Sequence, residues 1–137
     1  MIEKQSITDI IPQRAPFVMV DSILSVAPDR FVSTLFVDPE NTLVSQGLFT
    51  ESGMLENVAQ TSAAGFGTLT GEEGEAPRRG YIGSITRVEV YSLPEVGSQI
   101  RTVVTPTHRL DNIVMVSGRC YLDEILLLEC EMKIVLA

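Results

Sequence analysis

At 137 residues the chain has about the length of one domain, and a chain of this length buries enough of its surface to fold without disulfides. Apolar residues make up 45% of the chain and charged residues 20%, which excludes an intrinsically disordered or collagen-like protein. The formal net charge of −8 disfavours nucleic acid as a partner, because an acidic protein repels the phosphate backbone. We therefore expect a single domain over residues 1–137.

No segment of the sequence has the character of a membrane span or an export signal. The longest uninterrupted aliphatic run, Ile125 to Leu128, is far shorter than the ~20 apolar residues that a spanning helix needs. The N-terminal sequence MIEKQSITDI lacks an apolar stretch followed by a small-residue cleavage site. We expect a cytoplasmic protein without a membrane partner, in which Cys120 and Cys130 are reduced thiols of the core.

The N-terminal part of the chain predicts a short helical turn followed by a β-hairpin. Ser6 is a plausible cap for the turn, and Pro12 and Pro16 close it because proline favours extended geometry in the residue before it. The runs from Phe17 to Val26 and from Phe31 to Val37 are rich in strand-forming residues. The turn-prone sequence APDR joins them, which indicates two antiparallel strands.

One long buried helix is predicted next, in a segment that ends in GFG at Gly67. Thr50 and Ser52 are possible caps, and Glu51 in the first turn complements the positive end of the helix dipole. The residues that recur at helical spacing are Met54, Leu55, Val58, Ala59, Ser62, Ala63 and Phe66. A single carboxylate, Glu56, lies in the middle of this apolar pattern.

The C-terminal half predicts four strands after a polar loop from Thr70 to Gly80. Short turn sequences separate the runs, so neighbouring runs form antiparallel hairpins. The runs are Tyr81 to Ser92, Gln99 to Leu110, Ile113 to Leu122 and Ile125 to Leu136. We therefore predict an α+β fold in which an antiparallel sheet of about six strands curls around one long central helix. An exposed sheet edge favours pairing with a second copy, so we expect a dimer.

Three stretches of the sequence resemble those of one enzyme family. IPQRAPFVMVDSIL, Ile11 to Leu24, resembles the family's Leu-Pro-His-Arg-x-Pro-Phe-Leu-Leu-Val-Asp lead-in to the first strand. ENVAQ, Glu56 to Gln60, resembles its Glu-Ala-x-Ala-Gln helix motif, and Gly80 to Ile100 is similar to a strand that it ends in a Pro-Gly-Asp-like turn. Nearly the whole chain thus resembles the hotdog-fold 3-hydroxyacyl-acyl carrier protein dehydratases of fatty acid biosynthesis. The resemblance implies a hotdog fold, paired subunits and acyl thioester tunnels at their interface.

The activity that this resemblance implies is the loss of water from a 3-hydroxyacyl thioester carried by acyl carrier protein or coenzyme A. The reaction needs a base for the α-proton, an acid for the departing hydroxyl and donors for the thioester oxygen. The resemblance assigns proton transfer to Glu56 and loosely matches Gly53 to the glycine whose amide contacts the thioester. Gln60 is expected to orient Glu56, because an amide neither gives nor takes a proton usefully. The sequence indicates no metal or redox cofactor.

Further candidate residues concern the substrate and its carrier. Candidates for lining an acyl tunnel are Phe17, Met54, Tyr81 and Ile82. Core packing would explain each of these four equally well. The adjacent pair Arg78 and Arg79 is a candidate for docking phosphopantetheine or an acidic carrier protein, and a solvated loop is the alternative.

The sequence departs from the family pattern at the histidines. QGLF, Gln46 to Phe49, puts Leu48 where the family has its catalytic histidine, and Gln13 replaces a second histidine. Gln13 and Gln46 could position water or substrate, but the role of an ordinary loop residue is favoured for each. His108 is the only histidine of the chain and is expected to lie far from the helix. The shortened approach to Glu56 also resembles divergent dehydratase-like hotdog proteins encoded with aryl-polyene pathways, some of which work as partners of an active subunit.

Three functions stay open at this point. The chain could be a dehydratase with Glu56 in an apolar pocket as its proton-transfer group, a binding or partner subunit without turnover, or a thioesterase in which Glu56 activates water. The working assembly would be a homodimer, a larger assembly of dimers, or a heterodimer with an active dehydratase. The alternative to any of these roles for Glu56 is a water-facing stripe of Ser52, Glu56 and Gln60 at i, i+4 spacing.

Overall fold

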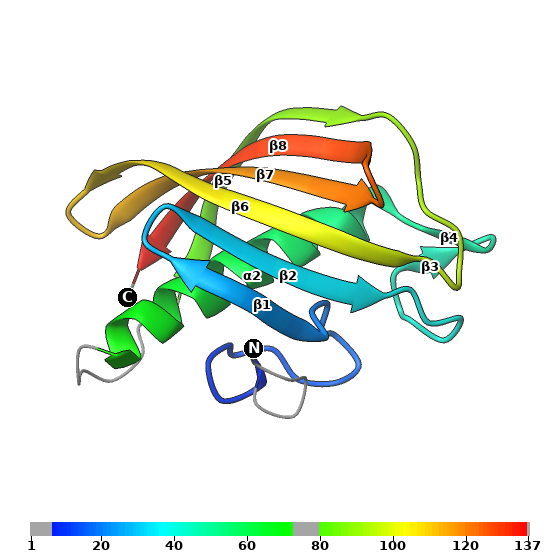
Figure 1. The fold of residues 1–137 in the computed structure, drawn as a ribbon, viewed down its shortest axis with the longest axis horizontal. Helices are drawn as coiled ribbons and strands as arrows, with labels where there is room; N and C mark the ends of the chain where they lie inside the picture. Colours follow the sequence, from blue (N-terminus) through cyan, green and yellow to red (C-terminus); the bar gives the residue numbers. More distant parts are fainter. Residues whose placement is uncertain (1–6, 73–79, 137) are drawn as a thin grey trace.

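The computed structural model describes residues 7–72 and 80–136, and its main feature is an antiparallel sheet wrapped around one helix (Figure 1). The six strands of the sheet lie in the order β1-β2-β6-β7-β8-β5. The helix α2 (Glu51–Glu72) packs on one face and contacts every one of them. The strands are β1 (Ser22–Ala27), β2 (Arg30–Phe36), β5 (Gly80–Val90), β6 (Gln99–Leu110), β7 (Ile113–Leu122) and β8 (Ile125–Leu136). The predicted α+β architecture is confirmed.

The last three strands have the predicted limits, but the first strand starts later than predicted. β1 begins at Ser22, whereas the sequence predicted a strand from Phe17. Side chains of α2 hold the backbone before β1, because Gln60 accepts a hydrogen bond from the Met19 N–H and Asn57 donates one to the Met19 carbonyl. A segment whose backbone groups bond to a helix in this way cannot also pair with a strand.

A short hairpin before α2 was not predicted. It consists of β3 (Val44–Ser45) and β4 (Leu48–Phe49), which pair with each other outside the main sheet. The two residues between them, Gln46 and Gly47, have φ angles of 55° and 78°. Positive φ at both central residues is the geometry of a type I′ turn, which matches the twist of two-residue hairpins. The sequence signal was the Gln-Gly pair between short apolar runs.

The helix begins as predicted and ends later than predicted. Thr50 caps it, since its Oγ1 accepts a hydrogen bond of 3.2 Å from the Gly53 N–H. The predicted end at Gly67 is wrong, because α2 continues to Glu72 and takes the first residues of the expected loop. Gly65 lies inside the helix, where an added Cβ would collide with the ring of Phe31. This glycine lets the helix approach the sheet closely and does not end it. Ser6, the expected cap of the N-terminal turn, lies outside the described residues.

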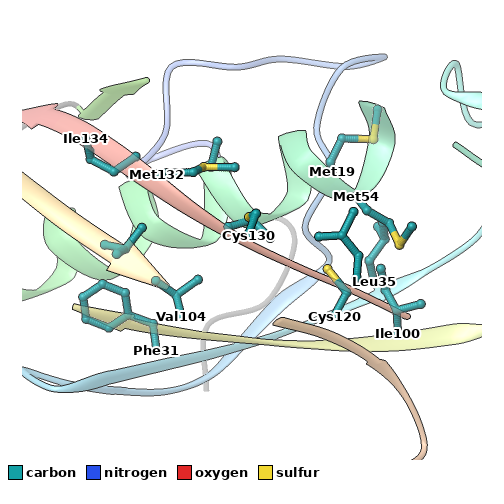
Figure 2. Packing of buried hydrophobic residues seen from close by; sticks show 14 of the residues in the cluster. Met19, Phe31, Leu35, Met54, Ile100, Val104, Cys120, Cys130, Met132 and Ile134 are labelled. Carbon is teal, nitrogen blue, oxygen red and sulfur yellow. The ribbon is translucent and has the colours of Figure 1, made fainter. Parts of the chain in front are cut away.

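Apolar side chains fill the space between α2 and the sheet. Figure 2 shows Phe31, Val104 and Met132 pointing into this space, and all three are fully buried. A smaller cluster packs the N-terminal turn against the helix through Ile7 and Ala63 among others. No helix in the described part of the chain combines the length and hydropathy that crossing a bilayer requires.

Both cysteines are free and buried in this core, as predicted. Burial raises the pKa of the Cys120 thiol to about 12 and that of Cys130 to about 11. Both thiols are therefore protonated and unreactive at neutral pH, which agrees with a packing role.

Candidate active site

Glu56 lies at the wall of a pocket of about 230 Å³. The N-terminal segment, α2, the start of β5 and the end of β8 surround this pocket, and the residues that line it are Gln13, Glu56, Ala59, Ala63, Tyr81, Ile82 and Ile134. On α2, Glu56, Ala59 and Ala63 share one face, at i, i+3 and i+7. The two alanines leave the space that larger side chains would fill. Glu56 is only half-buried, so its carboxylate lies between the core and the solvent.

Gln60 holds Glu56 from the core side. Its Nε2 donates to Glu56 Oε1 at 2.9 Å and to the Phe17 carbonyl at 2.9 Å, while its Oε1 accepts from the Met19 N–H at 2.6 Å. Gln60 is fully buried, so the water-facing stripe that the sequence left open is wrong for this residue. A side chain with three bonds has one orientation, and it fixes one carboxylate oxygen of Glu56.

Only part of the Glu56 carboxyl group is engaged by the described residues. Its Oε1 is engaged by Gln60, and within the described residues no hydrogen bond is recorded for Oε2. Most of the other residues that line the pocket are apolar.

Two of the four residues expected to line a tunnel face this pocket. Tyr81 and Ile82 line it and are 50% and 39% exposed, because β5 is an edge strand of the sheet. Met54 is fully buried in the main core, and Phe17 is 59% exposed; neither lines the Glu56 pocket.

The remaining candidates lie elsewhere or outside the described residues. Gly53 is buried, its N–H donates to Thr50, and an added Cβ would collide with the ring of Phe49. Packing at the start of α2 thus accounts for glycine at this position. Arg78 and Arg79 lie outside the described residues.

No imidazole of the chain reaches Glu56. Leu48, which stands where the family has its catalytic histidine, is a half-buried residue of β4. The single histidine, His108, is an exposed residue of β6 in a depression that it shares with Arg87 and Glu131. That depression has no residue in common with the Glu56 pocket, so the expectation that His108 lies away from the site agrees with the structure.

Gln13 is a pocket residue for which the sequence favoured an ordinary loop role over the positioning of water or substrate. It lines the Glu56 pocket, and its Oε1 is buried without a hydrogen-bond partner in the described part of the chain. The available signal was its position: Gln13 replaces a histidine of the family's lead-in to the first strand, and a substitution of one polar side chain by another indicates a polar environment.

A larger pocket of about 450 Å³ lies between the N-terminal segment and the end of β2. Its carboxylates hold the local backbone, since Asp21 accepts a bond from the Phe36 N–H and Asp38 one from the Glu40 N–H. These are turn and strand-end contacts of acidic side chains. The smaller pocket at Glu56 therefore remains the candidate site.

A six-stranded antiparallel sheet curled around one long helix defines a hotdog-fold protein. The model of the ApeP-like family, described as ApeP dehydratase, matches residues 5–136. The chain therefore belongs to the ApeP-like dehydratase family, as a divergent member of the hotdog dehydratases. No curated protein matches it by sequence.

Solved structures share the fold at low sequence identity. A chain of the dehydratase heterocomplex ApeI:P from Xenorhabdus doucetiae superposes with a TM-score of 0.88 at 15% identity, over 96% of this chain and 90% of that one. The uncharacterized protein PH1136 from Pyrococcus horikoshii has a TM-score of 0.72 at 12% identity, with 94% and 92% covered. A hypothetical thioesterase from Streptococcus pneumoniae, solved with coenzyme A, has a TM-score of 0.69 at 9% identity, with 85% and 84% covered. At these identities the likeness concerns the fold.

Proposed function

We propose that this protein takes an acyl thioester into the Glu56 pocket and that Glu56 is the proton-transfer group of a 3-hydroxyacyl thioester dehydratase. The observation that carries the proposal is a half-buried carboxylate, fixed by a fully buried glutamine, in the wall of a mainly apolar pocket. Membership of the ApeP-like dehydratase family supports the reaction class. The reaction would belong to fatty acid or polyene-type biosynthesis in the cytoplasm.

Dehydration of a 3-hydroxyacyl thioester requires two proton transfers. A base takes the α-proton from C2, the hydroxyl on C3 receives a proton, water leaves and a C2–C3 double bond forms. Ionised Glu56 takes the α-proton in this scheme. The proton for the hydroxyl comes either from the same carboxyl, once it is protonated, or from a group of a second subunit.

A second subunit is expected at the edge strand β5. This strand is eleven residues long and has no neighbour on its outer side within the described sheet, and its exposed apolar residues include Tyr81, Ile82 and Ile85. An unpaired, apolar edge favours strand addition. Because Tyr81 and Ile82 also line the Glu56 pocket, a subunit paired here would cover the pocket and could bring the imidazole that this chain lacks. The solved ApeI:P heterocomplex is consistent with such a mixed pair.

Two parts of the proposal rest on the sequence alone. Carrier docking by Arg78 and Arg79 stays a prediction, and so does thioester binding by the Gly53 amide, which here donates to Thr50. The same pocket would also suit a thioesterase, because a carboxylate that activates water needs no imidazole.

The test is the interconversion of 3-hydroxyacyl and enoyl thioesters, followed by the absorbance of the conjugated thioester. Wild-type protein and the Glu56→Gln variant are compared, each alone and mixed with a histidine-containing dehydratase subunit. We expect turnover by the wild type in at least one of these states and at least about a hundred-fold loss in the variant. Turnover that is equal in wild type and variant would overturn the assignment of Glu56. Release of free thiol from a saturated acyl thioester would instead identify a thioesterase.

A further inference from the structure

The Glu56 pocket contains a second polar group with no role in the reaction described above. Gln13 lines the pocket with Glu56, and its Oε1 is buried and lacks a hydrogen-bond partner among the described residues. A buried acceptor without a donor is unfavourable, and native proteins seldom keep one unless a ligand or water supplies the donor. Because Gln13 stands in the pocket wall, a molecule bound in the pocket is placed to supply that donor.

The segment that carries Gln13 is held on both sides. The Arg14 guanidinium donates to the carbonyls of Ile11 and Gln13, each at 2.8 Å, and the Phe17 N–H donates to the Arg14 carbonyl at 2.8 Å. A few residues further on, Gln60 bonds the Phe17 carbonyl, so the same buried side chain ties both this segment and Glu56 to α2. Gln60 therefore connects Glu56 to the segment that carries Gln13, and both residues line the same pocket.

The polar groups of the pocket select a particular kind of ligand. An ionised carboxylate and an amide oxygen are both hydrogen-bond acceptors, and most of the other lining residues are apolar. A ligand that presents a hydroxyl satisfies this pair, because the hydroxyl donates to one acceptor and keeps its lone pairs for a proton. A saturated chain leaves the Gln13 oxygen unpaired, and a ketone, which has no hydrogen to donate, cannot satisfy it either.

We infer that Gln13 is the specificity-determining residue of the site and that its Oε1 accepts a hydrogen bond from the C3 hydroxyl of the bound acyl chain. The inference rests on the proposed function and assigns a substrate contact to a residue outside the motif of α2. With its hydrogen directed at Gln13, the hydroxyl turns a lone pair toward the group that protonates it as water leaves. Gln13 gains and loses no proton in this step.

The inference is tested by equilibrium binding of three pantetheine ligands with equal chain length, in which an amide replaces the thioester so that elimination does not consume them. One carries a 3-hydroxyl group, one is saturated and one carries a 3-oxo group. We expect wild-type protein to bind the 3-hydroxy ligand about three- to ten-fold more tightly than the saturated one, the effect of one net hydrogen bond, and to bind the 3-oxo ligand no better than the saturated one.

The variant Gln13→Met keeps the length of the side chain and removes its acceptor. We expect its preference for the 3-hydroxy ligand to fall below about two-fold, with the saturated ligand bound as well as by the wild type. Gln99→Met makes the same change at an exposed residue of β6 and should keep the wild-type preference. If Gln13→Met does not fold, equal binding of the 3-hydroxy and saturated ligands by wild-type protein still overturns the inference.

The outcomes separate this inference from the proposed function. If the wild type binds the saturated and 3-hydroxy ligands equally, or if Gln13→Met keeps the wild-type preference, the role of Gln13 is overturned and that of Glu56 stands. If the wild type binds none of the three ligands, both are overturned.

Discussion

Replacing Gln60 by leucine tests whether one buried amide holds the site together. Leucine has a similar volume, so Gln60→Leu creates little cavity and mainly removes the bonds to Met19, Phe17 and Glu56. The Met19 N–H is fully buried and would be left without an acceptor, which costs about 1–3 kcal/mol. The Phe17 and Glu56 contacts are partly exposed and add less, so we expect a total loss of about 2–3 kcal/mol in the free energy of unfolding.

The expected loss translates into a melting temperature through the entropy of unfolding. An average of about 2.1 cal/mol/K per residue, applied to 137 residues, makes 1 kcal/mol equal to about 3.5 °C. Gln60→Leu should therefore melt about 7–10 °C below the wild type in a calorimetric scan. Gln99→Leu, at an exposed residue of β6, is the matched control and should change stability by less than about 0.5 kcal/mol. If Gln60→Leu also changes the free energy of unfolding by less than about 0.5 kcal/mol, the view that this amide anchors the segment before β1 is refuted.

Three further predictions concern Glu56, the edge strand and the core thiols. Glu56→Gln should keep the melting temperature within about 2 °C of the wild type while turnover is lost, because the amide fits the half-buried position; a large loss of stability would mean a structural role. Light scattering should show a wild-type dimer that Ile85→Glu on β5 dissociates, whereas Ile125→Glu at the exposed start of β8 leaves it intact; a dimeric Ile85→Glu would exclude this edge as the interface. Burial raises the pKa of Cys120 from 9.0 to about 12, so the contribution of this thiol to stability is constant below pH 9 and falls by about 1.4 kcal/mol per pH unit between pH 9 and pH 12. The free energy of unfolding measured in urea should therefore fall by about 1.4 kcal/mol more between pH 7 and pH 10 in wild type than in Cys120→Ala, and an equal fall in both proteins would contradict the assignment.

The C-terminal strands could be predicted to the residue because their local signals agree with their tertiary setting. β6, β7 and β8 alternate between buried and less buried positions and are joined by short turns. The N-terminal strand could not be predicted in the same way. Residues before Ser22 have strand-forming side chains, but Asn57 and Gln60 occupy the Met19 backbone groups that a neighbouring strand would need. Asn57 and Gln60 lie about forty residues from Met19 in the sequence, so a pattern read over a few neighbouring residues does not contain these bonds.

Glycines in the helix show a second limit of local patterns. A glycine ends a helix in many proteins, so GFG was a reasonable stop signal. Here Gly65 packs against Phe31 of β2, and the absence of a side chain lets the helix lie close to the sheet. The sequence contains the glycine but does not show the side chain that packs against it, so a local pattern could not tell that this glycine lies inside α2.

The site could be predicted from its motif but not from its pocket. Glu56 and Gln60 were identified by their spacing on one helix face, and the structure brings them into contact. Gln13 joins them across more than forty positions of sequence, through a segment with no regular secondary structure, and only its replacement of a family histidine drew attention to it.

The helix itself resolves the question of whether Glu56 faces water or the core. Ser52, Glu56 and Gln60 form one stripe at i, i+4 spacing, and along it the side chains change from exposed to half-buried to fully buried. α2 therefore passes from solvent into the core along this face, and Glu56 occupies the crossing point. A carboxylate one turn earlier would be an ordinary solvated charge, and one turn later it would need a buried counter-charge. At the crossing point it has a donor on the core side and a pocket beside it, which suits a group that must change its protonation state.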